Sequence, residues 1–109
     1  MNYKVQTLPE FDRQYKRLKK KYPSFASDFL KLLEKIKADP MSGTDLGKNC
    51  FKFRLGIRSK NKGKSGGARL ISHVVVKDET VFFLTIYDKA EKDNLTDREL
   101  KELLAYLTL

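Results

Sequence analysis

The stretch Cys50-Phe51-Lys52-Phe53-Arg54-Leu55 decides the fold of this chain, because the hydrophobic period changes there. Apolar and basic side chains alternate along it, and a period of two is typical of a strand with one buried face. Before it, apolar residues recur at helical spacing, apart from a short β-prone segment at residues 3–8. After it, the sequence stays β-rich up to a last helix. The pattern therefore predicts two helices followed by a sheet.

The two helices are predicted on either side of Pro23, which ends the first of them. Pro9 suits the first turn of the earlier helix, and Ser24 suits the cap of the later one. The apolar stripe of the first helix consists of Phe11, Tyr15, Leu18 and Tyr22. The stripe of the second consists of Phe25, Phe29, Leu32, Leu33 and Ile36. Such a short connection predicts a helical hairpin.

The rest of the chain is predicted as loops, strands and a well-marked helix. Residues 41–49 and 56–67 are predicted as loops, and residues 68–77 and 81–87 as a β-hairpin. The last helix begins at Thr96-Asp97-Arg98-Glu99, a capping box, with Leu95 and Leu100 placed as a hydrophobic staple around it. The predicted order is β-α-α-β-β-β-α. This is an α+β fold with a small, mostly antiparallel sheet, in one domain spanning residues 1–109.

Alternation along the strands predicts two chemically different faces of this sheet. The face expected to pack against the helical hairpin carries Phe51, Phe53, Leu55, Leu70, Ser72, Val74, Val76, Phe82, Leu84 and Ile86. The opposite face carries Lys52, Arg54, Arg69, Ile71, His73, Phe83, Thr85 and Tyr87. An antiparallel sheet can leave one face to solvent, and we expect this second face to be exposed. Arginines that grip phosphate and rings that stack on bases suit a nucleic-acid site.

The net charge of +9 is concentrated in one part of the chain. Residues 46–77 contain no acidic side chain, and elsewhere Lys and Arg balance Asp and Glu. The basic residues of this stretch are Lys48, Lys52, Arg54, Arg58, Lys60, Lys62, Lys64, Arg69 and Lys77. Such a concentration indicates a surface for a polyanion. The alternative is a solvated loop that keeps a small protein soluble.

Composition argues against several other classes of protein. No apolar run approaches the ~20 residues of a membrane span, and no apolar signal region opens the chain, so we expect a cytoplasmic protein. With one cysteine, Cys50, and one histidine, we expect no disulfide, metal site or cofactor. The glycine-rich loop at residues 63–67 precedes a strand instead of a helix, which argues against an NTP-binding loop.

The order of elements and three local motifs together resemble the RelE/ParE superfamily of type II toxin-antitoxin toxins, and most of all its HigB-like branch. The motifs are Phe51-Lys52-Phe53-Arg54, the run from Lys60 to Arg69, and Tyr87-Asp88-Lys89 before the last helix. Within the run, Lys64-Ser65-Gly66-Gly67-Ala68-Arg69 is the most specific element. The resemblance covers almost the whole chain and implies a RelE-like fold.

The resemblance implies a ribosome-dependent endoribonuclease that enters the ribosomal A site and cuts mRNA, with a cognate antitoxin as partner. Two alternatives stay open at this point, because fold alone does not decide function. One is an inhibitor of DNA gyrase built on the same scaffold, and the other is a non-catalytic RNA-binding module. The dense basic loop joined to Arg69 and Tyr87 favours the nuclease.

Residues of this chain that match the family's motifs receive roles from the resemblance. Arg69, assisted by Arg54, is expected to stabilise the phosphorane, and Tyr87 to act as general acid or base, with His73 as a further candidate. The residues expected to hold the RNA are Lys52, Arg58, Lys60, Lys62, Lys64 and Lys89. The three residues with proposed catalytic roles also have simpler interpretations: Arg69 as a solvated cation, Tyr87 as a ring at the core margin, and His73 as a strand residue whose hydrogen bonds are satisfied.

Overall fold

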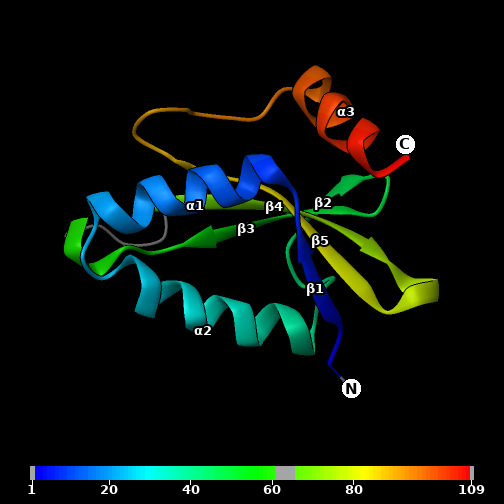
Figure 1. The fold of residues 1–109 in the computed structure, drawn as a ribbon, viewed down its shortest axis with the longest axis horizontal. Helices are drawn as coiled ribbons and strands as arrows, with labels where there is room; N and C mark the ends of the chain where they lie inside the picture. The colour runs from blue at the N-terminus through cyan, green and yellow to red at the C-terminus, as the bar shows by residue number, and fades with distance from the viewer. Residues whose placement is uncertain (1, 61–65, 109) are drawn as a thin grey trace.

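The computed structural model describes residues 2–60 and 66–108 (Figure 1). In chain order the elements are β1 (Lys4–Thr7), α1 (Pro9–Lys21), α2 (Phe25–Ala38), β2 (Thr44–Gly47), β3 (Cys50–Leu55), β4 (Ala68–Val75), β5 (Thr80–Asp88) and α3 (Asp97–Ala105). Short 3₁₀ turns occupy Arg58–Lys60, Val76–Asp78 and Tyr106–Thr108. The α+β fold class is confirmed: three helices accompany a mostly antiparallel sheet. Within the described residues, no helix is long and apolar enough to cross a bilayer.

The sheet has five strands in the order β1-β5-β4-β3-β2. β1 runs parallel to β5, and the other neighbours are antiparallel. The edge strand β2 lies within the segment predicted as a loop. Its residues are all exposed and lack an apolar alternation, so the sequence carried no signal for it. A turn with positive φ at Gly47, Lys48 and Asn49 connects it to β3.

The helical hairpin covers one face of the sheet, as predicted (Figure 1). Phe11 and Leu18 of α1 and Phe25, Phe29 and Ile36 of α2 are buried against that face. The strands contribute Phe51, Phe53, Leu55, Leu70, Val74, Val81, Phe83 and Ile86. The two stripes read from the sequence are therefore the helical half of this core.

The opposite face of the sheet is largely covered by α3, and only its β3 end is open to solvent, which corrects the prediction of an exposed face. Leu100 of α3 packs there with Ile71, Leu84 and Tyr87. Leu95, Leu103, Leu104 and Leu107 pack against the same cluster. The capping box at Thr96 and Glu99 is confirmed, with the Glu99 amide donating to Thr96 Oγ1 at 3.1 Å. The leucine stripe of this helix needs an apolar partner, and the second face of the sheet supplies it.

A register shift between β4 and β5 corrects the predicted faces of β5. Ile71 pairs with Thr85, but the next residue, Ser72, pairs with Phe83. An extra residue of this kind reverses the alternation beyond it. Phe83 consequently packs with the helical hairpin, whereas Phe82 packs on the α3 side.

Candidate functional site

Three of the predicted site residues lie side by side across the sheet. Arg54 of β3 pairs in register with Arg69 of β4, and Arg69 pairs with Tyr87 of β5. Directly opposed residues of neighbouring strands point to the same face, with Cβ atoms about 5 Å apart. We call these three residues the arginine–tyrosine row. The prediction that they share a face is confirmed.

Arg69 occupies the middle of the row and is 6% exposed. Its Nη1 donates to the carbonyl of Ala68 at 3.1 Å. The chain reaches Arg69 through Gly67, where a Cβ atom would lie only 1.9 Å from the carbonyl oxygen of Leu55. Only glycine allows this close approach, so the Gly67-Ala68-Arg69 part of the sequence motif has a steric explanation. Arg69 is thus held in the sheet and is not the solvated cation of the simpler interpretation.

The β3 end of the row is open to solvent. Arg54 is exposed and Lys52 is half-buried, and neither forms an ion pair with a described residue. Lys52 lies two residues before Arg54 on the same face, in register with Ile71. This end of the row therefore presents two cations to which an anion has free access.

Tyr87 closes the row at the other end and is 5% exposed. Its hydroxyl group is buried and has no hydrogen-bond partner of ordinary geometry among the described residues. Burial raises the pKa of Tyr87, and the charge of Arg69 opposes that rise. The phenol is consequently protonated at neutral pH and is suited to donate a proton. A cleft of about 360 Å³ between α1 and α3 includes Tyr87, Thr85, Glu10, Gln14 and Glu99 in its lining.

His73 does not join the row. It lies four residues along β4 from Arg69, a distance of about 13 Å in an extended strand. Its Nδ1 is 3.5 Å from Cys50 Sγ, and burial lowers the pKa of His73. Burial also raises the pKa of Cys50 to about 11. A neutral imidazole beside a protonated thiol agrees with the simpler interpretation of a satisfied strand residue.

Arg58 and Lys89, two of the predicted RNA-binding residues, are ion-paired. Arg58 Nε lies 2.7 Å from Oδ1 of Asp28, although the Arg58 side chain is 64% exposed. Lys89 Nζ lies 2.7 Å from Oδ1 of Asp93, and Lys89 directly follows the end of β5. Both cations are within reach of solvent, but each already has a carboxylate neighbour.

Lys60 is not on the surface, which corrects its prediction as a surface cation. Its side chain is 7% exposed, and its ammonium group is 2.8 Å from a carboxylate oxygen of the buried Asp88. A cation with a buried carboxylate partner has lost the solvent exposure that phosphate binding needs. Lys62 and Lys64 lie outside the described residues, so their predicted role stays a prediction.

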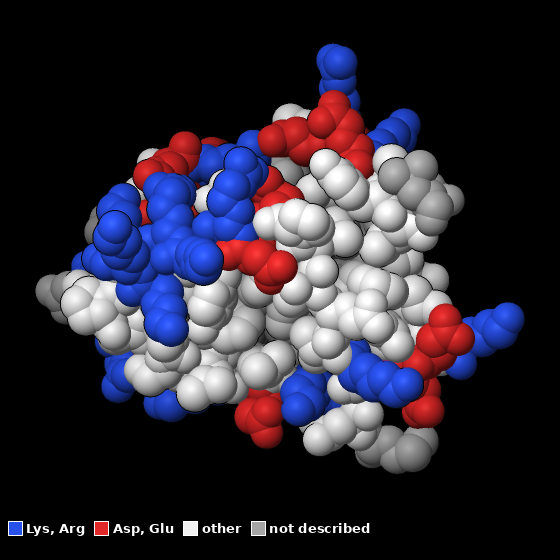
Figure 2. Space-filling model, viewed as in Figure 1, with Lys and Arg blue, Asp and Glu red and all other residues white. Residues whose placement is uncertain are grey.

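Two features of the structure were missed in the sequence. One is Asp88, a residue of the motif Tyr87-Asp88-Lys89 to which the sequence assigned no role of its own and which is fully buried. The other is a second basic surface: Figure 2 shows Lys and Arg side chains gathered over α1. The exposed cations of α1 are Arg13, Lys16, Arg17, Lys19, Lys20 and Lys21. The balance of charges outside residues 46–77 concealed this local excess. Among the described residues, no group of His, Cys, Asp and Glu side chains is arranged to hold a metal ion.

Comparison with known proteins identifies the family. A family model described as the RelE toxin of the RelE / RelB toxin-antitoxin system matches residues 11–108. The chain belongs to the RelE toxin family. The matched residues include the helical hairpin, the arginine–tyrosine row and α3.

Solved structures of RelE toxins share the fold of this RelE-family toxin. A doubly substituted variant of the Escherichia coli RelE toxin in the free state superposes with a TM-score of 0.62 at 17% identity, covering 97% of this chain and 98% of the other. The toxin-antitoxin complex RelBE of E. coli gives 0.63 at 18% identity, covering 79% and 95%. The complex RelBE2 of Mycobacterium tuberculosis gives 0.60 at 16% identity, covering 81% and 99%. At these identities the likeness establishes the fold and not the residues of the site.

Proposed function

We propose that this RelE-family toxin is a metal-independent, ribosome-dependent endoribonuclease that cuts mRNA and stops translation. The observation that carries the proposal is the arginine–tyrosine row, in which two cations and a protonated phenol lie on one face across three adjacent strands. Membership in the RelE toxin family supports the same activity. No observation favours a gyrase inhibitor or a non-catalytic RNA-binding module.

In the proposed reaction, the ribose 2′-oxygen attacks the adjacent phosphorus, and the bond to the 5′-oxygen of the next nucleotide breaks. The products are a 2′,3′-cyclic phosphate and a 5′-hydroxyl end. Arg69 and Arg54 stabilise the negative charge of the phosphorane, which is usually the largest single contribution to catalysis. Tyr87 donates the proton that the leaving 5′-oxygen requires, because burial keeps its phenol protonated.

The row itself contains no group that accepts a proton from the 2′-hydroxyl at neutral pH. Both guanidinium groups are permanently charged, and the phenol is a donor. An activity that depends on the ribosome agrees with this incomplete set, since the ribosome would supply or position the missing base. We infer that RNA approaches over β3, where Arg54 and Lys52 are accessible, and reaches Tyr87 last.

The proposal includes the partners and the compartment. RNA contacts are assigned to Lys52, with Lys62 and Lys64 as further candidates. Arg58 and Lys89 are weaker candidates because Asp28 and Asp93 pair with them. The partners are the ribosome, mRNA and a cognate antitoxin, in the cytoplasm. Solved RelE toxins bound to RelB support the antitoxin partner. Assignment to the HigB-like branch rests on the motif that ends at Arg69.

Cleavage of mRNA on purified ribosomes tests the proposal, with cut sites mapped by primer extension. Wild-type protein should cut mRNA bound to ribosomes and leave free mRNA intact. Arg69→Ala should lose about 10²-fold or more in rate while remaining folded, because it removes a charge contact of the transition state. Lys31→Ala is a matched control, an exposed cation of α2 on the other side of the molecule's core.

Three outcomes would contradict the proposal in different ways. Near wild-type cleavage by folded Arg69→Ala would show that the arginine–tyrosine row takes no part in the reaction. Inhibition of gyrase supercoiling without mRNA cleavage would favour the gyrase inhibitor. Ribosome or RNA binding with neither activity would favour the non-catalytic module.

A further inference from the structure

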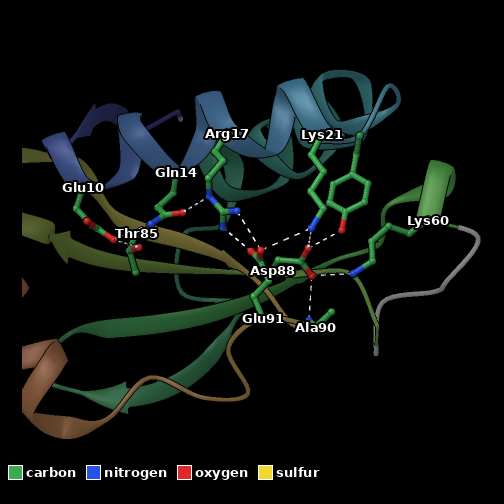
Figure 3. Close-up of polar contacts among 10 residues, drawn as sticks. Glu10, Gln14, Arg17, Lys21, Lys60, Thr85, Asp88, Ala90 and Glu91 are labelled. Carbon is green, nitrogen blue, oxygen red and sulfur yellow. Dashed lines mark hydrogen bonds and ion pairs between the residues drawn. The ribbon is translucent and has the colours of Figure 1, made fainter.

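A fully buried carboxylate, that of Asp88, lies directly behind the arginine–tyrosine row. Asp88 follows Tyr87 at the end of β5, and its side chain points to the opposite face of the sheet, toward α1 (Figure 3). It pairs in register with Ala68, the residue before Arg69. Asp88 and Ala68 are therefore the immediate backbone neighbours of Tyr87 and Arg69, two of the three residues of the row.

The Asp88 carboxylate binds three chain segments besides its own strand. Oδ1 accepts from Lys60 Nζ at 2.8 Å and from the Ala90 amide at 2.9 Å, and Oδ2 accepts from the Tyr22 hydroxyl at 2.5 Å. Lys21 Nζ is 3.6 Å from Oδ2. Burial alone would raise the pKa of Asp88, but the Lys60 and Tyr22 donors reverse that effect and lower it to about 2. The carboxylate is thus ionised and satisfied.

Lys60 extends this contact to the start of β4. Its ammonium group also donates to the Gly66 carbonyl at 2.9 Å. The adjacent residue Gly67 accepts from the Lys89 amide at 3.0 Å, just beyond Asp88. Through Lys60, Asp88 therefore holds Gly66, and the residue that follows Asp88 holds Gly67; the chain enters β4 and reaches Arg69 through these two glycines.

Stability alone does not explain this arrangement. A buried ion pair adds little net stability, because the loss of hydration of both charges offsets their attraction, and apolar residues of the same volume often do as well. What the pair does provide is a fixed geometry between segments that are distant in sequence. The residues so fixed are the ends of the strands that carry Arg69 and Tyr87.

We propose that Asp88, through its ion pair with Lys60, is a positioning residue that aligns Arg69 and Tyr87 from the opposite face of the sheet. The part of this proposal that concerns cleavage rests on the proposed nuclease function; the part that concerns alignment does not. Asp88 touches no substrate in this account and acts only through the strand ends.

A neutral double variant, Asp88→Asn/Lys60→Met, tests the proposal. The amide oxygen takes the place of Oδ1 and accepts from the Ala90 amide, and the amide nitrogen takes the place of Oδ2 and donates to the Tyr22 hydroxyl. No buried charge is left without a partner, so the variant should fold. Lys37→Gln/Glu34→Gln is the matched control, because it removes an ion pair on α2 that is not part of this network and whose side chains are 35% and 72% exposed. The measurements are thermal unfolding, ribosome binding, cleavage rate, and titration of the Tyr87 phenol by ultraviolet difference against a Tyr87→Phe background.

If Asp88 aligns the row, the double variant binds ribosomes like the wild type but cleaves about tenfold more slowly or worse, as expected for a small misplacement of reacting groups. The titration midpoint of Tyr87 shifts in the double variant because the distance from the phenol to Arg69 changes. The control variant keeps the wild-type cleavage rate and the wild-type Tyr87 titration. A folded double variant with unchanged cleavage and unchanged Tyr87 titration would overturn the proposal.

The two proposals fail in distinguishable ways. If wild-type protein cuts no mRNA, the nuclease function fails, and the Tyr87 titration still decides whether Asp88 aligns the row. If the double variant does not fold, Asp88→Asn/Lys60→Gln replaces it. This variant also leaves no buried charge without a partner, and the same shift in Tyr87 titration is required.

Discussion

The Asp88 carboxylate should make the stability of this protein depend on pH in acid. Its pKa is about 2 in the folded protein, against 3.8 for an unperturbed aspartate. A carboxyl whose pKa is lowered by folding stabilises the protein above its unfolded pKa, and that contribution is lost as pH falls through the folded pKa. The difference in pKa corresponds to about 2 kcal/mol in the free energy of unfolding. We expect this contribution to be complete at pH 5 and almost gone at pH 2.

Urea unfolding of wild type and Asp88→Asn at pH 5, 4, 3 and 2 measures this contribution. Other carboxylates with lowered pKa that do not contact Asp88, such as Asp28 and Glu99, are present in both proteins and cancel in the difference. The advantage of the wild type over the variant should shrink by about 2 kcal/mol from pH 5 to pH 2. A difference that stays constant over this range would show that Asp88 is not held ionised by Lys60 and Tyr22, and would refute the reasoning.

Three further predictions concern the site and the surface. Tyr87→Phe should slow mRNA cleavage by about 10²-fold or more, measured on ribosomes, while thermal stability stays nearly the same because the buried hydroxyl forms no hydrogen bond of ordinary geometry with a described residue. Gly67→Ala should lower the melting temperature and the cleavage rate together, since its Cβ would meet the Leu55 carbonyl; unchanged unfolding would contradict the close approach. Neutralising three exposed cations of α1 should weaken ribosome binding and flatten its salt dependence by roughly 0.7 to 0.9 per lost contact in a log-log plot, without moving the cut sites. These cations are Lys16, Lys19 and Lys20.

Hydrophobic periodicity, together with the prolines and capping residues that mark helix ends, predicted the helices and the central strands. Pro9, Pro23 and the capping box at Thr96 act locally, and their effect does not depend on the rest of the fold. The strand β2 was missed because its polar residues pair with β3 at an exposed edge and need no apolar alternation. Such a strand exists only because a neighbouring strand offers hydrogen bonds, which is a tertiary condition.

The two faces of the sheet were harder to predict, because alternation fails at a bulge. A single extra residue on β5, Leu84, exchanged the faces of Phe82 and Phe83 and itself faces α3, while the register of Arg69 and Tyr87 stayed intact. The prediction that Arg54, Arg69 and Tyr87 share one face was therefore correct, but the prediction that this face is exposed was wrong for Arg69 and Tyr87. The leucine stripe of α3 indicated that this helix needs an apolar partner. The prediction of an exposed second face left the stripe without such a partner, whereas in the structure that face provides it.

A count of charges in the sequence treats every cation as free to bind an anion. The structure shows which of these cations already have a carboxylate partner within the protein. In the basic stretch, Lys60 and Arg58 pair with the buried carboxylates Asp88 and Asp28, which lie far from it in sequence. Arg54 and Lys52 have no such partner among the described residues. A paired, buried cation fixes geometry, whereas an unpaired one at the surface attracts an anion. The same stretch therefore supplies both the frame of the site and its attraction for RNA, and long-range pairing with Asp28 and Asp88 decides which residue does which.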